Sequence, residues 1–348
     1  MIGPLTPERP TTRTRIRSRS QRGVSGGAVS HGGTNTESSL QYRQISPKSP
    51  NGGAGCLTIT MNAASFPPAG YNADFLQISL PLSAPPAGTL MRELLYTHFT
   101  VLLDPARRLA ISTGVNIDGD QVVTVDRADN WHLDARIPVY EQAGEGVYAR
   151  NDLDRGHLVR RQDPVWGDEA IARQANYETF AYTNAAPQAA AFNQSKQLWL
   201  GLEDHVLTYA RTNGNRISVF TAPVLSTQDP IYRGVKIPQA FWKIAAWTTT
   251  TKGSTVLHAA GFVLDQSPQL DDIDLDTVRA SAPMYGKPPP LGPYRTYQVP
   301  LVDIVDLTRL NLTALSEADV YATAPAIRED ADHRTRWTEL TDTAGIHL

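Results

Sequence analysis

Apolar and polar residues alternate over two neighbouring stretches in the first third of the chain, Tyr96–Leu103 and Arg108–Ile117. Alternation with a period of two is typical of strands that have one buried face, so both stretches are predicted to be strands. The segment between them, Asp104–Arg107, contains Asp and Pro and has the composition of a turn. The two strands are therefore predicted to form a hairpin.

Longer apolar stretches in the second half of the chain predict three more strands, and Thr179–Asn184 predicts a short one. Apolar residues at helical spacing predict helices over residues 165–178, 193–211 and 300–309. Long strands mixed with few helices favour an α+β fold, with a central antiparallel β-sheet and flanking helices. The three long strands are Arg216–Leu225, Ala240–Thr249 and Thr255–Asp265.

Composition divides the chain into three parts. Residues 1–60 are poor in apolar side chains and rich in Ser, Thr, Gly and Pro. Such a segment buries too little surface to offset the entropy of ordering, so we predict a disordered basic tail or linker. Residues 61–315 are predicted to form the folded domain, and residues 316–348 a polar, acidic C-terminal tail.

The net charge of -3 hides an uneven distribution. Residues 1–60 carry about +6 and the remainder about -9, so a polyanion would need a local basic cleft or a bound metal ion on this acidic body. The only cysteine, Cys56, excludes an intramolecular disulfide and a cysteine-cluster zinc site.

The sequence predicts no membrane span, because it contains no apolar run of the required length. No apolar stretch follows the charges at the start of the sequence, so no secretory signal is predicted. An Arg- and Ser-rich start loosely fits an organelle transit peptide, which we keep as an alternative to the linker. The compartment stays open between a latent cytoplasmic protein and one exported by another route.

The most informative local motif is Asp154-Arg155-Gly156-His157, which Arg160 and Arg161 follow closely. A lone histidine at a strand end is usually structural. Here, however, the surrounding arginines make a positive patch. A neutral imidazole with a pKa of ~6.5 can accept a proton at working pH. The motif therefore favours general-base chemistry on an anionic substrate.

A second cluster follows, with Asn184 in TNAAPQ, Asn193 in FNQ, and Glu203 ten residues later. Asn193 lies where a helix is predicted to begin, so it is either an N-cap or a neutral oxygen ligand for a hard cation. Glu203 either hydrogen-bonds the waters of such a cation or is a solvated helix residue.

DRGH, TNxxPQ, FNQ and WxxxE, in this order, resemble the DNA/RNA non-specific endonucleases, an endonuclease G-like family of the ββα-metal (His-Me finger) superfamily. The resemblance runs from about residue 70 to about residue 310. It implies a ββα-metal active-site motif in the fold and a Mg²⁺ or Mn²⁺ cofactor. The implied roles are His157 as general base, Arg155 on the phosphate in the transition state, Asn193 as direct metal ligand, Glu203 on metal-bound water, and Asn184 as a polar support near the base.

The resemblance also implies a backbone carbonyl near Phe180 that fixes the imidazole tautomer, and a further phosphate-binding arginine upstream. Arg127 and Arg136 are both candidates for that arginine. Arg160 and Arg161 are candidates for the substrate cleft, with balancing of Asp163 and Glu169 as the alternative. The spacing from Asn193 to Trp199 is two residues longer than in the best-known members, and a loop before the helix would absorb the difference.

The sequence thus predicts a metal-dependent endonuclease that cuts DNA and RNA and leaves 5′-phosphate ends. The alternative is a degenerate nuclease fold that serves as a nucleic-acid-binding or interaction module. An unrelated hydrolase using His205 or His258 is a third hypothesis, which no nucleophile-elbow motif supports. Expected partners are DNA and RNA, with a homodimer and an inhibiting or activating protein as further possibilities.

Overall fold

The computed structural model describes residues 70–150, 152–189, 199–267, 295–321, 337–341 and 345–346. The chain divides into two units, residues 1–60 and 61–348, and all described residues belong to the second unit. None of the described helices is long and apolar enough to cross a membrane.

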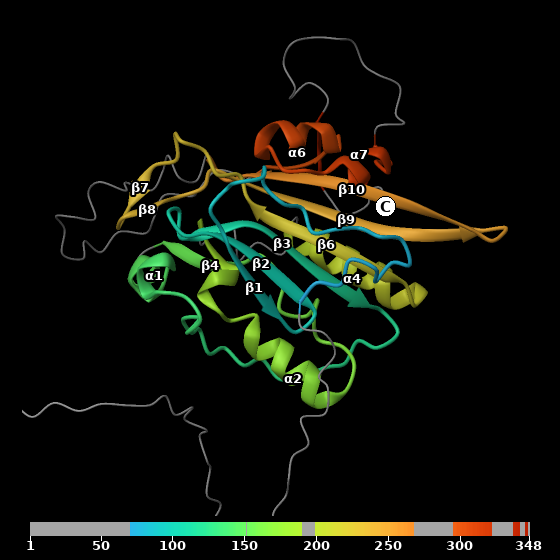
Figure 1. Ribbon diagram of the computed structural model, residues 1–348, viewed down its shortest axis with the longest axis horizontal. Helices are drawn as coiled ribbons and strands as arrows, with labels where there is room; N and C mark the ends of the chain where they lie inside the picture. Colours follow the sequence, from blue (N-terminus) through green and yellow to red (C-terminus); the bar gives the residue numbers. More distant parts are fainter. Residues whose placement is uncertain are drawn as a thin grey trace, which may run out of the picture. The chain divides into compact units, whose positions relative to one another are not determined.

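A sheet of eight antiparallel strands forms the centre of the described domain (Figure 1). Its order is β1-β2-β3-β6-β9-β10-β11-β12, so the chain leaves the sheet after β3 and re-enters it at β6. The strands are β1 (Arg92–Tyr96), β2 (Phe99–Asp104), β3 (Leu109–Asp118), β6 (Arg216–Pro223), β9 (Ala240–Thr251), β10 (Ser254–Asp265), β11 (Arg295–Val299) and β12 (Thr338–Glu339).

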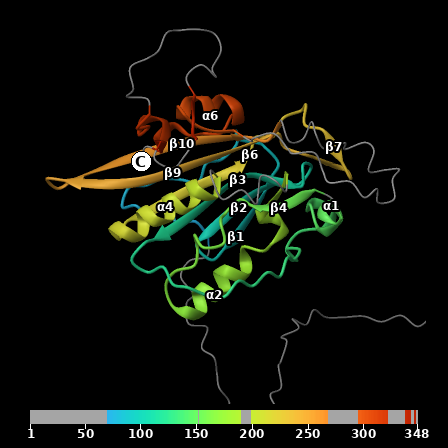
Figure 2. The same ribbon diagram turned by 180° about the vertical axis from the view of Figure 1, so that it is seen from behind.

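Both faces of this sheet are covered, because alternate residues of its strands face two separate cores. In β6, Val219 belongs to one core and Phe220 to the other. The first core includes residues of α4 (Trp199–Asn213) and α1 (Glu145–Tyr148). The second lies beneath α6 (Leu301–Thr308) and α7 (Thr313–Glu317), which Figures 1 and 2 show on the opposite side from α4.

Two smaller, two-stranded sheets stand outside the main sheet. β4 (Leu153–His157) pairs with β5 (Ala185–Ala189), and β7 (Ile231–Tyr232) pairs with β8 (Val235–Lys236). Since α4 is the next described element after β5, these three elements give the ββα order. The prediction of an α+β fold with a central antiparallel sheet and a ββα motif is confirmed.

The predicted hairpin is present as β2 and β3, but the strand expected over Tyr96–Leu103 is interrupted. β1 ends at Tyr96, and His98 turns the chain with a φ of 66°. The apolar alternation runs through this turn because Tyr96 and Phe99 are cross-strand neighbours whose rings stack at 4.7 Å. A two-residue turn that keeps both flanking side chains in the core leaves no break in the pattern.

The predicted helices are present with shifted ends, as α2 (Glu169–Glu178), α4 and α6. The strand predicted over Thr179–Asn184 is wrong. There the chain forms a 3-10 turn, η2 (Tyr182–Asn184), and strand β5 begins only at Ala185. The turn forms because the three side chains of η2 each bond to a different part of the domain, which an extended strand could not achieve.

Part of the predicted C-terminal tail packs on the domain. Asp319 is buried and its Oδ2 accepts a hydrogen bond from the backbone N–H of Leu301 at 2.8 Å. Further on, Thr338 and Glu339 of β12 pair with β11. Residues after 315 therefore contribute to the outer edge of the sheet and to the start of α6.

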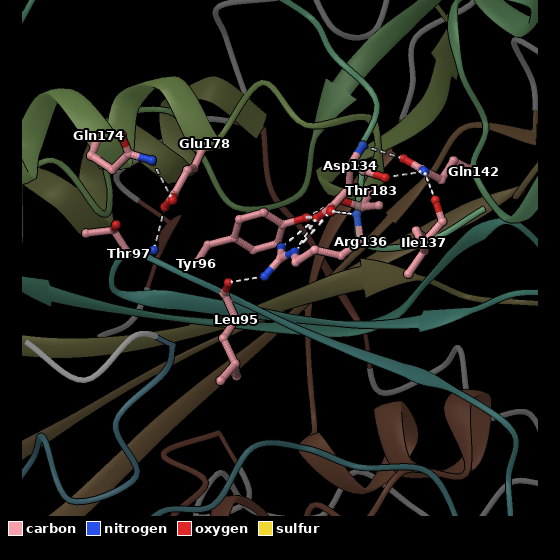
Figure 3. Close-up of polar contacts among 10 residues, drawn as sticks. All are labelled: Leu95, Tyr96, Thr97, Asp134, Arg136, Ile137, Gln142, Gln174, Glu178 and Thr183. Carbon is pink, nitrogen blue, oxygen red and sulfur yellow. Dashed lines mark hydrogen bonds and ion pairs between the residues drawn. The ribbon is translucent and has the colours of Figure 1, made fainter. Parts of the chain in front are cut away.

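Tyr96 joins three segments that are far apart in the sequence (Figure 3). Its hydroxyl donates to Asp134 Oδ2 and lies 2.6 Å from Thr183 Oγ1 in η2. Burial raises the pKa of Asp134, but hydrogen bonds from Arg136 and Tyr96 outweigh this effect and lower the pKa to about 2. The carboxamide of Gln142 closes the loop by bonding to both the N–H and the carbonyl of Asp134. The loop around Asp134 is thereby fixed to β1 and to η2.

We expect Tyr96→Phe to lower the free energy of unfolding by about 1–2 kcal/mol, because two buried oxygens lose a hydrogen-bond partner. Chemical denaturation of the purified protein measures this change. Tyr140→Phe is the matched control, because Tyr140 is 74% exposed and its change should stay within about 0.5 kcal/mol. Equal stability of both variants would contradict the bridging role of the Tyr96 hydroxyl.

Candidate active site

Strand β4 presents Arg155 and His157 on the same face, because residues two apart in a strand point the same way. Gly156 between them faces the other side, where a Cβ atom would lie 2.0 Å from the Cδ of Gln188. Gln188 is buried and cannot move aside freely. Gly156 of DRGH and Gln188 of TNxxPQ thus pack directly against each other. This contact lets β4 and β5 lie close together.

His157 lies between two aromatic rings. The Trp131 ring is 4.7 Å from the imidazole and the Phe180 ring is 5.1 Å away in an edge-on arrangement. Burial, with the positive charges of Arg127 and Arg161 acting in the same direction, lowers the pKa of His157 to about 3. The imidazole is therefore neutral at physiological pH.

The carbonyl partner expected near Phe180 stays a prediction. The Phe180 carbonyl accepts a hydrogen bond from the N–H of His132, and the chain forms a β-bridge between His132 and Ala181 at this point. The Nε2 atom of His157 is buried and has no hydrogen-bond partner in the described part of the chain. Among the described residues, the rings of Trp131 and Phe180 are the contacts that orient the imidazole.

Arg155 is held on several sides. Its Nη2 forms an ion pair with Glu145 at 2.5 Å. Its guanidinium carbon lies 5.9 Å from the Trp131 ring centroid and 5.8 Å from that of Tyr148. Its Nε is buried and has no hydrogen-bond partner among the described residues. The Trp131 ring thus contacts the side chains of both Arg155 and His157.

Asn184 is fully buried and binds backbone, not the base. Its Oδ1 accepts from the N–H of Val159, and its Nδ2 donates to the carbonyls of Val159 and Thr179. These three bonds fix the chain directly after His157. Within the described residues, Asn184 therefore supports the base by holding the backbone that carries it.

The four other predicted arginines occupy different environments. Arg127 lies near the base, with its guanidinium 5.3 Å from the Phe180 ring centroid, and its charge reaches His157. Arg136 instead binds Asp134 and the Leu95 carbonyl, so its donors are taken up by the Tyr96 network of Figure 3. Between the two candidates for the upstream phosphate contact, the geometry favours Arg127.

Arg160 and Arg161 point to different surroundings. Arg161 bonds to Asn176 on α2 and its charge acts on His157. Arg160 pairs with Asp204 and lies 3.8 Å from Glu203, while its Nη1 is buried without a partner among the described residues. The alternative role was to balance the charges of Asp163 and Glu169. In the described part of the chain, no ion pair joins Arg160 or Arg161 to either of those carboxylates.

Glu203 belongs to a cluster of charges behind the site. Its Oε1 accepts a hydrogen bond from the Nζ of Lys243, a fully buried lysine of β9, at 2.9 Å. Asp163 lies close to this cluster, and burial raises the pKa of Asp163 to about 7. The Glu203 carboxylate is thus fixed from β9 and is not a freely solvated helix residue.

Asn193, the predicted metal ligand, lies outside the described residues. Among the residues that are described, no three His, Cys, Asp or Glu side chains gather into a metal-binding group. Trp242 and Trp247 are buried core residues. His258 stacks on Trp247 and its Nε2 contacts the Thr249 hydroxyl, a structural setting.

Three residues of this site were not identified from the sequence: Trp131, Glu145 and Tyr182. Trp131 lies in a loop of mixed composition and Glu145 in a helix of four residues, so neither has a recognisable pattern. Tyr182 directly precedes the TNxxPQ motif, and that position is the only available signal.

Comparison with known proteins identifies the family. Residues 82–319 match the family described as DNA/RNA non-specific endonuclease. The chain belongs to this family. The resemblance inferred from the DRGH, TNxxPQ and WxxxE motifs is therefore confirmed.

Similar proteins include one described as uncharacterized protein y4fB, from Sinorhizobium fredii. It is 36% identical over 293 residues, which cover 76% of this chain and 42% of that protein. Mitochondrial endonuclease G of Bos taurus is 30% identical over 95 residues, or 27% of this chain and 29% of that protein. The chain thus spans less than half the length of either relative.

Among solved structures, a complex of EndoG with EndoGI resembles this endonuclease-family chain with a TM-score of 0.46 and 18% sequence identity. The match covers 64% of this chain and 85% of that chain.

Because the pKa of His157 is lowered, its imidazole should release its proton below the ordinary titration range and stay neutral from pH 8 down to about pH 5. An NMR titration of the imidazole carbon-bound protons measures this, with the signal assigned by its loss in His157→Gln. We expect no inflection near pH 6.5. An inflection there would show that the imidazole is solvated and not enclosed by Trp131 and Phe180.

Proposed function

We propose that this protein is a metal-dependent, sugar-non-specific endonuclease that hydrolyses phosphodiester bonds in DNA and RNA and leaves 5′-phosphate ends. Membership in the DNA/RNA non-specific endonuclease family supports a nuclease. The observation that carries the proposal is the pairing of a neutral imidazole with a fixed guanidinium on one face of β4. His157 and Arg155 project side by side, and the Trp131 ring contacts both.

Buried polar atoms without partners support an anionic substrate. In the described part of the chain, Arg155 Nε, His157 Nε2 and Arg160 Nη1 are all of this kind, and all come from residues 155–160. An unsatisfied buried polar group is costly, so these atoms on and just after β4 are expected to receive a ligand. Phosphate oxygens are suitable acceptors for the two arginine donors.

His157 acts as the general base in this proposal. Its neutral imidazole takes a proton from the attacking water, a contribution of roughly 10²–10⁴-fold to the rate. Arg155 stabilises the negative charge that grows on the phosphoryl oxygens in the transition state, and Arg127 adds a second positive charge nearby. Asn184 keeps the base in place through the backbone of Val159.

Asn193 and Glu203 would hold the cation. Their amide and carboxylate oxygens are the ligand types that Mg²⁺ and Mn²⁺ take in proteins, and Mg²⁺ keeps most of its waters. The Glu203 carboxylate fits this role, because Lys243 engages only its Oε1 and Arg160 stays 3.8 Å from its Oε2. The bound ion would supply Lewis-acid stabilisation to phosphoryl and leaving oxygens.

Lack of sequence specificity follows from where the positive groups lie. Contacts confined to phosphate carry no sequence information and do not distinguish deoxyribose from ribose. Arg155, Arg127, Arg160 and Arg161 are the groups proposed to face the backbone of the nucleic acid. The homodimer and the inhibiting or activating partner remain predictions from the sequence.

The direct test is cleavage of plasmid DNA and of a structured RNA in Mg²⁺. We expect both to be cut, cleavage to stop in a chelator, and His157→Ala to lower the rate by roughly 10²–10⁴-fold. End analysis of the products should show 5′-phosphates. His258→Ala is the matched control and should cleave at the unmodified rate, because His258 stacks on Trp247 away from β4.

The degenerate-fold alternative predicts the opposite result. Binding of DNA and RNA without cleavage in either metal would favour a binding module. Loss of activity in His258→Ala together with an active His157→Ala would support the unrelated-hydrolase hypothesis.

A further inference from the structure

Glu145 lies at the start of α1, outside every motif noted in the sequence, and yet it contacts Arg155 directly. Its Oε2 is 2.5 Å from Arg155 Nη2. The same oxygen accepts a hydrogen bond from the Tyr182 hydroxyl at 2.6 Å. Hydrogen bonds from Tyr182 and then Arg155 lower the pKa of Glu145, so the carboxylate is charged at neutral pH.

Tyr182 is a firm anchor for this carboxylate. Its side chain is buried, and its ring stacks on Tyr148 of α1 at 5.9 Å. It belongs to η2, whose next two residues hold Tyr96 and the backbone after His157. The path from η2 through Tyr182 and Glu145 to Arg155 therefore consists of two short hydrogen bonds that start from a rigid turn.

The rest of the α1 segment is also fixed. Arg233, at the turn between β7 and β8, donates hydrogen bonds to the carbonyls of Gly146 and Ala149. Glu145 is thus part of a short helix that Arg233 of the β7–β8 hairpin holds in place. The position of Glu145 therefore does not depend on the intrinsic stability of this helix alone.

We propose that Glu145 is a positioning residue for Arg155, and that Tyr182 orients Glu145 for this purpose. The inference rests on the proposed nuclease function, in which Arg155 stabilises charge on the phosphate. The carboxylate binds one edge of the guanidinium at Nη2, while the rings of Trp131 and Tyr148 flank the group. The exposed part of the guanidinium is then held in one orientation toward the substrate.

A role in stability alone does not account for this arrangement. The side chain of Glu145 is 57% exposed and that of Arg155 is 31% exposed, and ion pairs of this kind contribute little to folding. A flexible arginine loses conformational freedom about several rotatable bonds when it binds phosphate. Fixing its guanidinium beforehand removes that entropic cost from the transition state. The benefit therefore belongs to catalysis.

The test compares kcat and KM of Glu145→Gln with the unmodified protein on a fluorogenic oligonucleotide in Mg²⁺. We expect kcat to fall about tenfold with little change in KM, since outer partners of active-site groups act on the transition state. Tyr182→Phe keeps the ring contacts with Tyr148 and Trp131 and should lower kcat by a smaller factor. Thermal unfolding of each variant should stay close to that of the unmodified protein.

Glu169→Gln is the matched control. Glu169 forms an ion pair of the same length with Arg173 on the exposed surface of α2, away from β4. The same chemical change at Glu169 should leave kcat and KM unchanged. A tenfold loss in this control as well would overturn the inference.

A double-mutant cycle decides whether Glu145 acts through Arg155. In an Arg155→Ala background, the additional Glu145→Gln change should alter kcat by less than twofold. An equal tenfold loss of kcat in both backgrounds would contradict a positioning role for Glu145. Faster cleavage by Glu145→Gln would also contradict it, because it would mean that the carboxylate competes with phosphate for Arg155. Inactivity of the unmodified protein would refute the proposed function, whereas an active protein with an equally active Glu145→Gln would refute only the inference.

Discussion

Three consecutive side chains, Tyr182, Thr183 and Asn184, bond to three separate segments of the domain, and the geometry of the site depends on them. Tyr182 reaches Glu145 on α1, Thr183 reaches Tyr96 on β1, and Asn184 clamps the backbone of Val159. A 3-10 turn directs successive side chains about 120° apart, which a strand cannot do. This turn lets one short segment fix the chain that carries the base, the loop near Trp131, and the partner of Arg155.

The electrostatics of the site follow from that packing. The same packing that orients His157 shields its Nε2 from water, and Arg127 and Arg161 add positive charge around the ring, so its pKa is held far below the ordinary value. A base that stays neutral beside several arginines suits a polyanionic substrate, whose binding would relieve the concentration of positive charge. The acidic body predicted from the sequence and a locally basic site are thus compatible.

Sequence alone was sufficient where local patterns carry the information. The alternation in β6, β9 and β10 and the DRGH and TNxxPQ motifs predicted the antiparallel sheet and the family. Contacts between distant residues could not be predicted in this way. Arg127 and Arg136 have the same side chain, and only the fold shows that Arg136 donates its hydrogen bonds to Asp134 and to the Leu95 carbonyl. The strand predicted over Thr179–Asn184 was wrong because propensity does not register side-chain bonds to other segments, and Glu145 was missed for the same reason.

We propose that His157 and Arg155 face one phosphate site beside Asn193 and Glu203. The most direct test is a crystal structure of the protein with a non-hydrolysable phosphorothioate oligonucleotide and Mg²⁺. We expect a backbone phosphate within hydrogen-bond distance of Arg155, a water between that phosphate and His157, and a cation ligated by Asn193 with Glu203 on its waters. An oligonucleotide bound on another face, or a cation bound away from Asn193, would contradict this site.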